Sequence, residues 1–228
     1  MGGRRGWIVA LVVLVGGVAV GLASLGADRV PSTARESGLD HHTLPALLYF
    51  ALVTLVDTYL GWCVIPVLLG YGAVRSPGRA AATGATFALV ALTAYTVARH
   101  IALVHDAQKL AALDLPPSPT QVPDPSVLDT AVGVVLSPLL VVAVAGAVLG
   151  ALAGYHARRL PFLLLVLAAA VAVDLWRRTN TPWLSIANGV PNVLLVAAGI
   201  VALAWTVVAT LRMHRGSSTA SSGAPRHP

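Results

Sequence analysis

Residues 44–70 read LPALLYFALVTLVDTYLGWCVIPVLLG, an apolar run that carries a single carboxylate, Asp57, near its middle. About 20 apolar residues are enough to cross the ~30 Å hydrocarbon core of a bilayer, so this run predicts a transmembrane helix. A carboxylate at that depth costs roughly 2.5–3.5 kcal/mol. Asp57 therefore needs a partner, a proton or water.

The composition of the whole chain is that of a membrane protein. Its 228 residues are 57% hydrophobic and 11% charged, with a mean hydropathy of +0.79. A water-soluble domain of this size would lack the polar residues to cover its surface. Lys109 is the only lysine among 15 basic residues, and Ala, Val, Leu and Gly dominate. This bias is typical of GC-rich coding and favours a prokaryotic plasma membrane.

The basic character and the single cysteine each exclude a class of function. The isoelectric point is about 10.2, but the charges flank apolar segments instead of forming a stripe with interleaved aromatic residues, so we expect no nucleic-acid binding. Cys63 lies inside an apolar run, which excludes a disulfide framework and a paired-thiol redox or zinc motif.

We predict an all-α fold, a polytopic bundle of six transmembrane helices within residues 1–214. The expected helices are residues 7–25, 44–69, 80–104, 127–153, 160–176 and 190–213. The first is expected to be retained instead of cleaved, because the apolar core of a signal peptide is usually ~7–15 residues. The fifth is short, and is either a thin span flanked by arginines or a re-entrant half-helix; we favour the span.

The connections follow from proline, glycine and serine. Prolines in residues 107–126 predict an extended outer loop, and residues 215–228 predict a disordered cytoplasmic tail. Ser76-Pro77 is expected to begin the third helix, Gly189 to end a short interfacial turn, and Pro191 to begin the last helix. The alternative for this last region is an unwound segment that exposes its backbone to a solute.

Charge predicts the orientation. With six spans, nine basic residues and no acid fall on the face that holds both termini, whereas six basic residues and eight acids fall on the other face. Because Lys and Arg are concentrated on the cytoplasmic side of membrane proteins, we expect a multi-pass plasma-membrane protein with both termini in the cytoplasm. The bilayer is then its first partner.

Asp57 is the leading candidate for function. Thr54 lies on the same face of its helix, and Thr93, Thr96 and His100 share a face of the third helix. If the two faces meet, a polar path leads from Asp57 toward the outer surface, with Arg99 as an alternative partner. Ionisable groups near the membrane midplane carry protons or solutes in transporters. The alternative is a structural carboxyl that fixes helix packing.

A second cluster could hold a metal. Its members are Asp40, His41 and His42 before the second helix, and His100 and His105 at the end of the third. Imidazoles and carboxylates suit copper, zinc or iron, and two opposed histidines could hold a haem. Their spacing matches no standard motif, so we favour ordinary surface histidines and expect no cofactor.

Small residues predict where helices approach closely. Gly146, Gly150 and Gly154 recur every four residues, and Gly17 and Gly21 repeat the pattern in the first helix. We favour packing within the chain. The alternative is a homo- or hetero-oligomer, in which the protein is a non-catalytic subunit or scaffold.

The motifs of common enzymes are absent from the sequence. It contains no phosphate-binding glycine loop, no G-x-S-x-G elbow and no H-E-x-x-H. We therefore expect no catalytic residues, and the sequence favours a small transport-type or permease-like protein over an enzyme.

Overall fold

The computed structural model describes the chain over six stretches, which are residues 3–28, 51–52, 55–112, 133, 138–179 and 186–221. Its elements are α1 (Gly3–Asp28), α4 (Tyr59–Gly72), α5 (Pro77–Ala112), α7 (Pro138–Ala157), the 3-10 helix η2 (Pro161–Leu164), α8 (Leu165–Arg177) and α9 (Ile186–Ser221). No strand occurs in these stretches, so the all-α class is confirmed.

Four helices are long and apolar enough to cross a membrane. They are the segments Gly6–Asp28, Pro77–Lys109, Leu140–Ala157 and Gly189–Met213 of α1, α5, α7 and α9. The two remaining helices are shorter: α4 has 14 residues and α8 has 13. At 1.5 Å per residue each rises only ~20 Å, less than the ~30 Å core. The described residues thus supply four candidate spans and two shorter helices, and the expected bundle of six spans is not confirmed.

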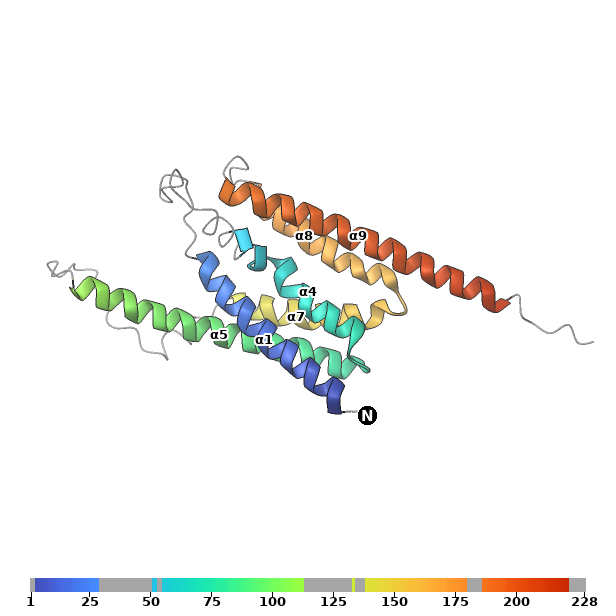
Figure 1. The fold of residues 1–228 in the computed structure, drawn as a ribbon, viewed down its shortest axis with the longest axis horizontal. Coiled ribbons are helices and arrows are strands. Elements are labelled where there is room, and N and C mark those ends of the chain that lie inside the picture. Colours follow the sequence, from blue (N-terminus) through green and yellow to red (C-terminus); the bar gives the residue numbers. More distant parts are fainter. Residues whose placement is uncertain are drawn as a thin grey trace, which may run out of the picture.

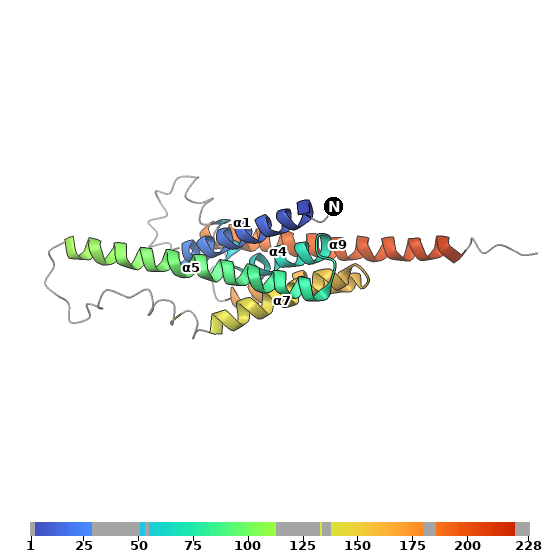
Figure 2. The ribbon, with the colours of Figure 1, turned by 90° about the horizontal axis from the view of Figure 1, so that it is seen from below.

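The helices form a bundle with a peripheral pair. Helices α1, α4, α5 and α7 pack against one another, and α8 and α9 lie together along α4 (Figure 1). The far parts of α5 and α9 project beyond the bundle in opposite directions (Figure 2). The start of α1 and the end of α9 lie at the same end of the molecule (Figure 1).

The bundle has two ends that differ in charge. The Asp28 end holds Asp28 and the start of α4. The Arg75 end holds Gly6, the turn after α4 and the start of α5, with Arg75 and Arg79.

The glycines at four-residue spacing pack within the chain. A Cβ atom at Gly17 would lie 2.8 Å from Val90 Cγ1 on α5, and one at Gly154 would collide with the Val67 carbonyl of α4. Gly150 and Gly146 also face α4, and Gly21 faces the main chain of α5. Helices of one chain therefore occupy both small-residue ridges, as favoured above.

The helix expected over residues 44–69 is not continuous. It is interrupted at Asp57 and Thr58, and α4 begins anew at Tyr59. Apolar periodicity does not reveal such a break, because both halves of the run are equally hydrophobic.

Two long helices extend further than expected. Helix α5 continues to Ala112, six residues into the region expected to form a loop, because residues 107–112 are good helix formers and the first proline is Pro116. Helix α9 runs through Gly189 and Pro191, so the expected stop and restart there are wrong. Pro191 lies in the second turn of the helix, where its ring removes one hydrogen bond near the end.

Helix α9 also continues to Ser221, so the first residues of the expected disordered tail are helical. No proline interrupts the chain between Pro191 and Pro225, which leaves the helix free to continue. Asn192 is fully buried on this helix, and its amide makes no hydrogen bond in the described stretches.

Candidate functional site

The site begins with the break in the second apolar run. Thr58 is the N-cap of α4, and its Oγ1 accepts a hydrogen bond from Gly61 N at 2.9 Å. The same hydroxyl donates to the Leu55 carbonyl at 2.7 Å, on the other side of the break. One buried side chain therefore satisfies backbone groups of both segments, which an interrupted helix inside a membrane requires.

Asp174 of α8 completes the cap. Its carboxylate accepts from Tyr59 N at 2.9 Å and from Leu60 N at 3.0 Å, and only 2% of the residue is exposed. Trp62 N donates to the Thr58 carbonyl at 3.0 Å. All four N–H groups of the first turn of α4 thus have acceptors, and the negative charge lies at the positive end of the helix dipole.

Gly61 is required by the geometry of the break. A Cβ atom there would overlap the carbonyl of Val56, which comes from the segment before the break. Only glycine lets the two segments approach so closely.

Asp57 lies in the break itself, half-buried. The Ser24 hydroxyl of α1 and the Trp62 side chain lie next to its carboxyl group, and Asp28 and Arg177 are charges that act on it. Ser24 is 6% exposed, and its Oγ makes no hydrogen bond of standard geometry in the described stretches. A buried hydroxyl with unused capacity therefore lies beside a carboxyl group.

Asp57 lies at the Asp28 end of α4. The 14 residues of this helix rise ~21 Å, so Asp57, which precedes the first of them, is separated by that length from the turn that carries Arg75.

A hydrogen-bonded chain runs from α1 to α5 close to Asp57. Tyr95 donates its hydroxyl proton to Asp28 Oδ2 at 2.6 Å, and Arg99 Nη1 donates to the Tyr95 hydroxyl at 3.1 Å. The Arg99 guanidinium also lies 5.8 Å from the centre of the Tyr95 ring. Asp28 and Arg99 are exposed, so this chain lies at the surface of the Asp28 end, where the charge of Asp28 acts on Asp57.

Two arginines at the end of α8 complete the group at the break. Arg177 lies over the Tyr59 ring at 5.1 Å, and Arg178 interacts with both Asp174 and Asp57. We call the whole group the helix-break cluster: Ser24, Asp28, Asp57, Thr58, Tyr95, Arg99, Asp174, Arg177 and Arg178. It combines three carboxylates with three guanidiniums drawn from α1, the break, α5 and the end of α8.

The structure brings only part of the expected polar path together. Thr93 and Thr96 donate their hydroxyl protons to carbonyls of their own helix, and Thr93 lines a groove between α1 and α5. Tyr95 and Arg99 are the residues of α5 that interact with Asp28 instead. Arg99 reaches Asp28 through Tyr95, and His100 Nδ1 is buried without a hydrogen bond to the described part of the chain. Thr54 lies outside the described residues.

Seven members of the cluster were not among the site residues expected from the sequence: Ser24, Asp28, Thr58, Tyr95, Asp174, Arg177 and Arg178. Ser24 and Asp28 end the first helix, where they resemble ordinary loop residues, and Asp174 counted only as a charge of the outer face. The spacing of Tyr95 and Arg99, four residues apart, is a signal that could have been used, because such residues share a helix face.

The expected metal cluster is only partly described. His105 is exposed on α5, whereas Asp40, His41 and His42 lie outside the described residues. Among the residues that the structure describes, no three His, Cys, Asp or Glu side chains come close enough to hold a metal ion. Comparison with known proteins finds no matching family, no similar curated protein and no similar solved structure.

Proposed function

We propose that this is a transport-type membrane protein that moves protons or small cations, and that Asp57 takes up and releases the ion. The observation that carries the proposal is the break at residues 57–58, which positions a carboxyl group among polar side chains inside the bundle. Interrupted helices form the ion and substrate sites of many transporters, because they expose polar groups at membrane depth.

The three carboxylates of the cluster differ in how firmly they are held. Asp174 is fixed by two backbone N–H groups, and Asp28 accepts the Tyr95 hydroxyl. Among the described residues, Asp57 has no such backbone partner and lies beside the Ser24 hydroxyl, which makes no hydrogen bond of standard geometry in those stretches. Oxygen atoms of this kind are the ligands that protons and hard cations prefer, so Asp57 is the natural site of exchange and Asp28 its link to the surface.

Charge supports an orientation for this protein. The described acids Asp28, Asp57, Asp106 and Asp174 lie at or toward the Asp28 end. The Arg75 end carries five arginines with described side chains and no described acid; they are Arg75, Arg79, Arg158, Arg159 and Arg212. We propose that the Arg75 end faces the cytoplasm of a plasma membrane, together with both termini.

The two alternative functions, a scaffold and a redox protein, depend on other surfaces or residues. A scaffold would need a surface other than the ridge of Gly146, Gly150 and Gly154, since α4 packs there. The exposed face of α9 is the candidate, and partner capture that survives Asp57→Asn would favour this reading. A redox protein would contain bound metal or haem, which absorbance and metal analysis of purified protein detect.

Flux through reconstituted protein tests the transport proposal. Vesicles that contain the protein and a pH-sensitive dye receive an imposed proton gradient. Parallel vesicles that contain a sodium-sensitive dye receive a sodium gradient. We expect flux of one of these ions above that of empty vesicles. Asp57→Asn should reduce it to background, because the amide neither ionises nor releases a proton, whereas the control Asp106→Asn on the projecting part of α5 should retain it.

Two results would contradict the proposal. The first is that protein-containing vesicles conduct neither ion faster than empty ones. The second is that Asp57→Asn conducts as well as the unmodified protein while both variants insert equally.

A further inference from the structure

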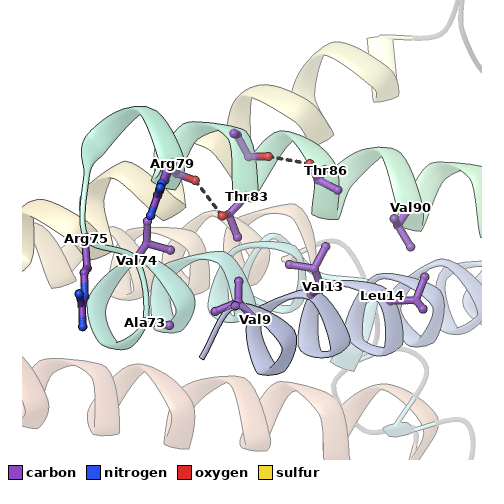
Figure 3. A pocket seen from close by; sticks show the side chains of 13 residues that line it. Val9, Val13, Leu14, Ala73, Val74, Arg75, Arg79, Thr83, Thr86 and Val90 are labelled. Atoms are coloured by element: carbon purple, nitrogen blue, oxygen red, sulfur yellow. Dashed lines mark hydrogen bonds between the residues drawn. The ribbon is translucent and has the colours of Figure 1, made fainter. Parts of the chain in front are cut away.

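The Arg75 end carries a cavity that the helix-break cluster does not use. It encloses about 630 Å³ between α1, the turn after α4 and the first turns of α5. Figure 3 shows Arg75 and Arg79 at one end of this cavity, with Leu14 and Val90 toward the other. The remaining wall is almost entirely apolar.

The cavity continues as a groove along the seam between α1 and α5. A second hollow of about 580 Å³ shares Leu14, Thr86 and Val90 with the first. Together they follow α1 from Gly6 to Leu22, a rise of ~24 Å. One leaflet of the hydrocarbon core is only ~15 Å deep, so the groove is long enough for a lipid chain.

The chemistry of the two ends differs. Leu14, Leu22 and Leu89 in the groove are exposed, so the groove opens sideways to the bilayer, where it accepts apolar chains. At the other end, Arg75 and Arg79 are exposed and no described acid lies near them. Helix α5 also begins here, at Pro77, with its positive dipole end.

We propose that this groove is a binding site for an anionic phospholipid, whose phosphate lies between Arg75 and Arg79 and whose acyl chain follows the seam of α1 and α5. The charge complementarity selects the headgroup, and the apolar walls select a lipid over a free anion. Basic pockets between transmembrane helices are established sites of this kind in membrane proteins generally. The proposal is independent of the ion site, which lies at the opposite end of α4.

Lipid retention tests this site directly. The protein is reconstituted into mixed vesicles of phosphatidylglycerol and phosphatidylcholine with identical acyl chains, extracted in mild detergent, and its retained lipids are measured by mass spectrometry. We expect enrichment of phosphatidylglycerol over its share of the vesicle. Arg75→Ala with Arg79→Ala should lower that preference about fivefold for each arginine removed.

A matched variant controls for net charge. Arg159→Ala with Arg212→Ala removes two exposed arginines from the same end, away from the cavity, and should retain the preference. A further variant, Ala10→Trp, fills the cavity without changing charge and should also release the lipid. Because Ala10 is exposed, this variant is expected to fold.

Three outcomes would overturn the proposal. Equal retention of the two lipids by the unmodified protein would make the groove an ordinary lipid-facing surface. Equal losses in the two double-arginine variants would make the preference a general effect of charge. Displacement by glycerol phosphate, which lacks acyl chains, would make the arginines a site for a free phosphate ester.

Discussion

Replacing Asp174 tests whether the helix break is held by α8. Its carboxylate makes two hydrogen bonds to backbone N–H groups, at 2.9 Å and 3.0 Å, and the residue is 2% exposed. A hydrogen bond to a charged group contributes about 1.5–3 kcal/mol. Asp174→Ala removes both bonds and leaves two buried donors, so we expect a loss of about 3–5 kcal/mol, with partial relief where water enters.

Replacing Asp174 by asparagine should cause only part of this loss of stability. Its single carbonyl oxygen can accept one N–H group, while its amide NH₂ faces the other donor and cannot accept from it. We therefore expect Asp174→Asn to cost about half as much as Asp174→Ala, roughly 1.5–3 kcal/mol. A stability that falls from the unmodified protein to Asp174→Asn and again to Asp174→Ala is the result expected for a carboxylate that caps two donors.

Thermal unfolding of the detergent-purified protein measures the difference. For a chain of this size 1 kcal/mol corresponds to about 2–4 °C, so Ala should lower the melting temperature by about 6–20 °C. Trp62, in the first turn of α4, serves as a local fluorescence reporter once the other four tryptophans are replaced by phenylalanine. Asp106→Ala, an exposed charge on α5, should cost less than about 1 kcal/mol. A melting temperature for Asp174→Ala equal to that of Asp106→Ala would refute the capping role.

Two further substitutions test how α4 is fastened elsewhere. Gly154→Val should separate α7 from α4, because its Cβ would collide with the Val67 carbonyl; we expect a loss of more than about 2 kcal/mol, seen as a lower melting temperature. Arg158 donates three hydrogen bonds, each of 2.6 Å, to carbonyls at the end of α4. Arg158→Ala should therefore destabilise by about 2–4 kcal/mol, whereas its exposed neighbour Arg159→Ala should not, and equal melting of the two arginine variants would contradict this.

The sequence is informative about what lies in the membrane. The cores of α1, α5, α7 and α9 overlap four of the expected spans, because long apolar runs identify such helices directly. In space, the described acids gather at one end of the bundle, with Asp174 beside the start of α4, whereas Arg158 lies at the other end of α4.

The helix break could not be predicted from the apolar runs of the sequence. A carboxylate within an apolar run looks like a charge on a continuous helix, and Thr58 is a cap only if the helix stops before it. Its partner Asp174 is 115 residues away from Tyr59 along the chain. Such a contact depends on how α8 packs against α4, which no local pattern records.

The two short helices are best understood as a pair. A helix that ends within a membrane must satisfy its free N–H and C=O groups inside the protein. Asp174 satisfies the first N–H groups of α4, and Arg158 satisfies carbonyls at its other end. Both residues belong to the stretch 158–174, which contains η2 and most of α8 and runs alongside α4 in the opposite direction.

The same segment that holds α4 also carries the arginines that act on Asp57. Asp174, Arg177 and Arg178 are adjacent on α8 and its last turn, and Arg177 and Arg178 interact electrostatically with Asp57. A change of charge at Asp57 therefore acts on the same helix that caps the start of α4. If an ion binds at Asp57, as proposed, the change of charge acts on Arg177 and Arg178, and α8 connects these arginines to the Asp174 cap at the start of α4.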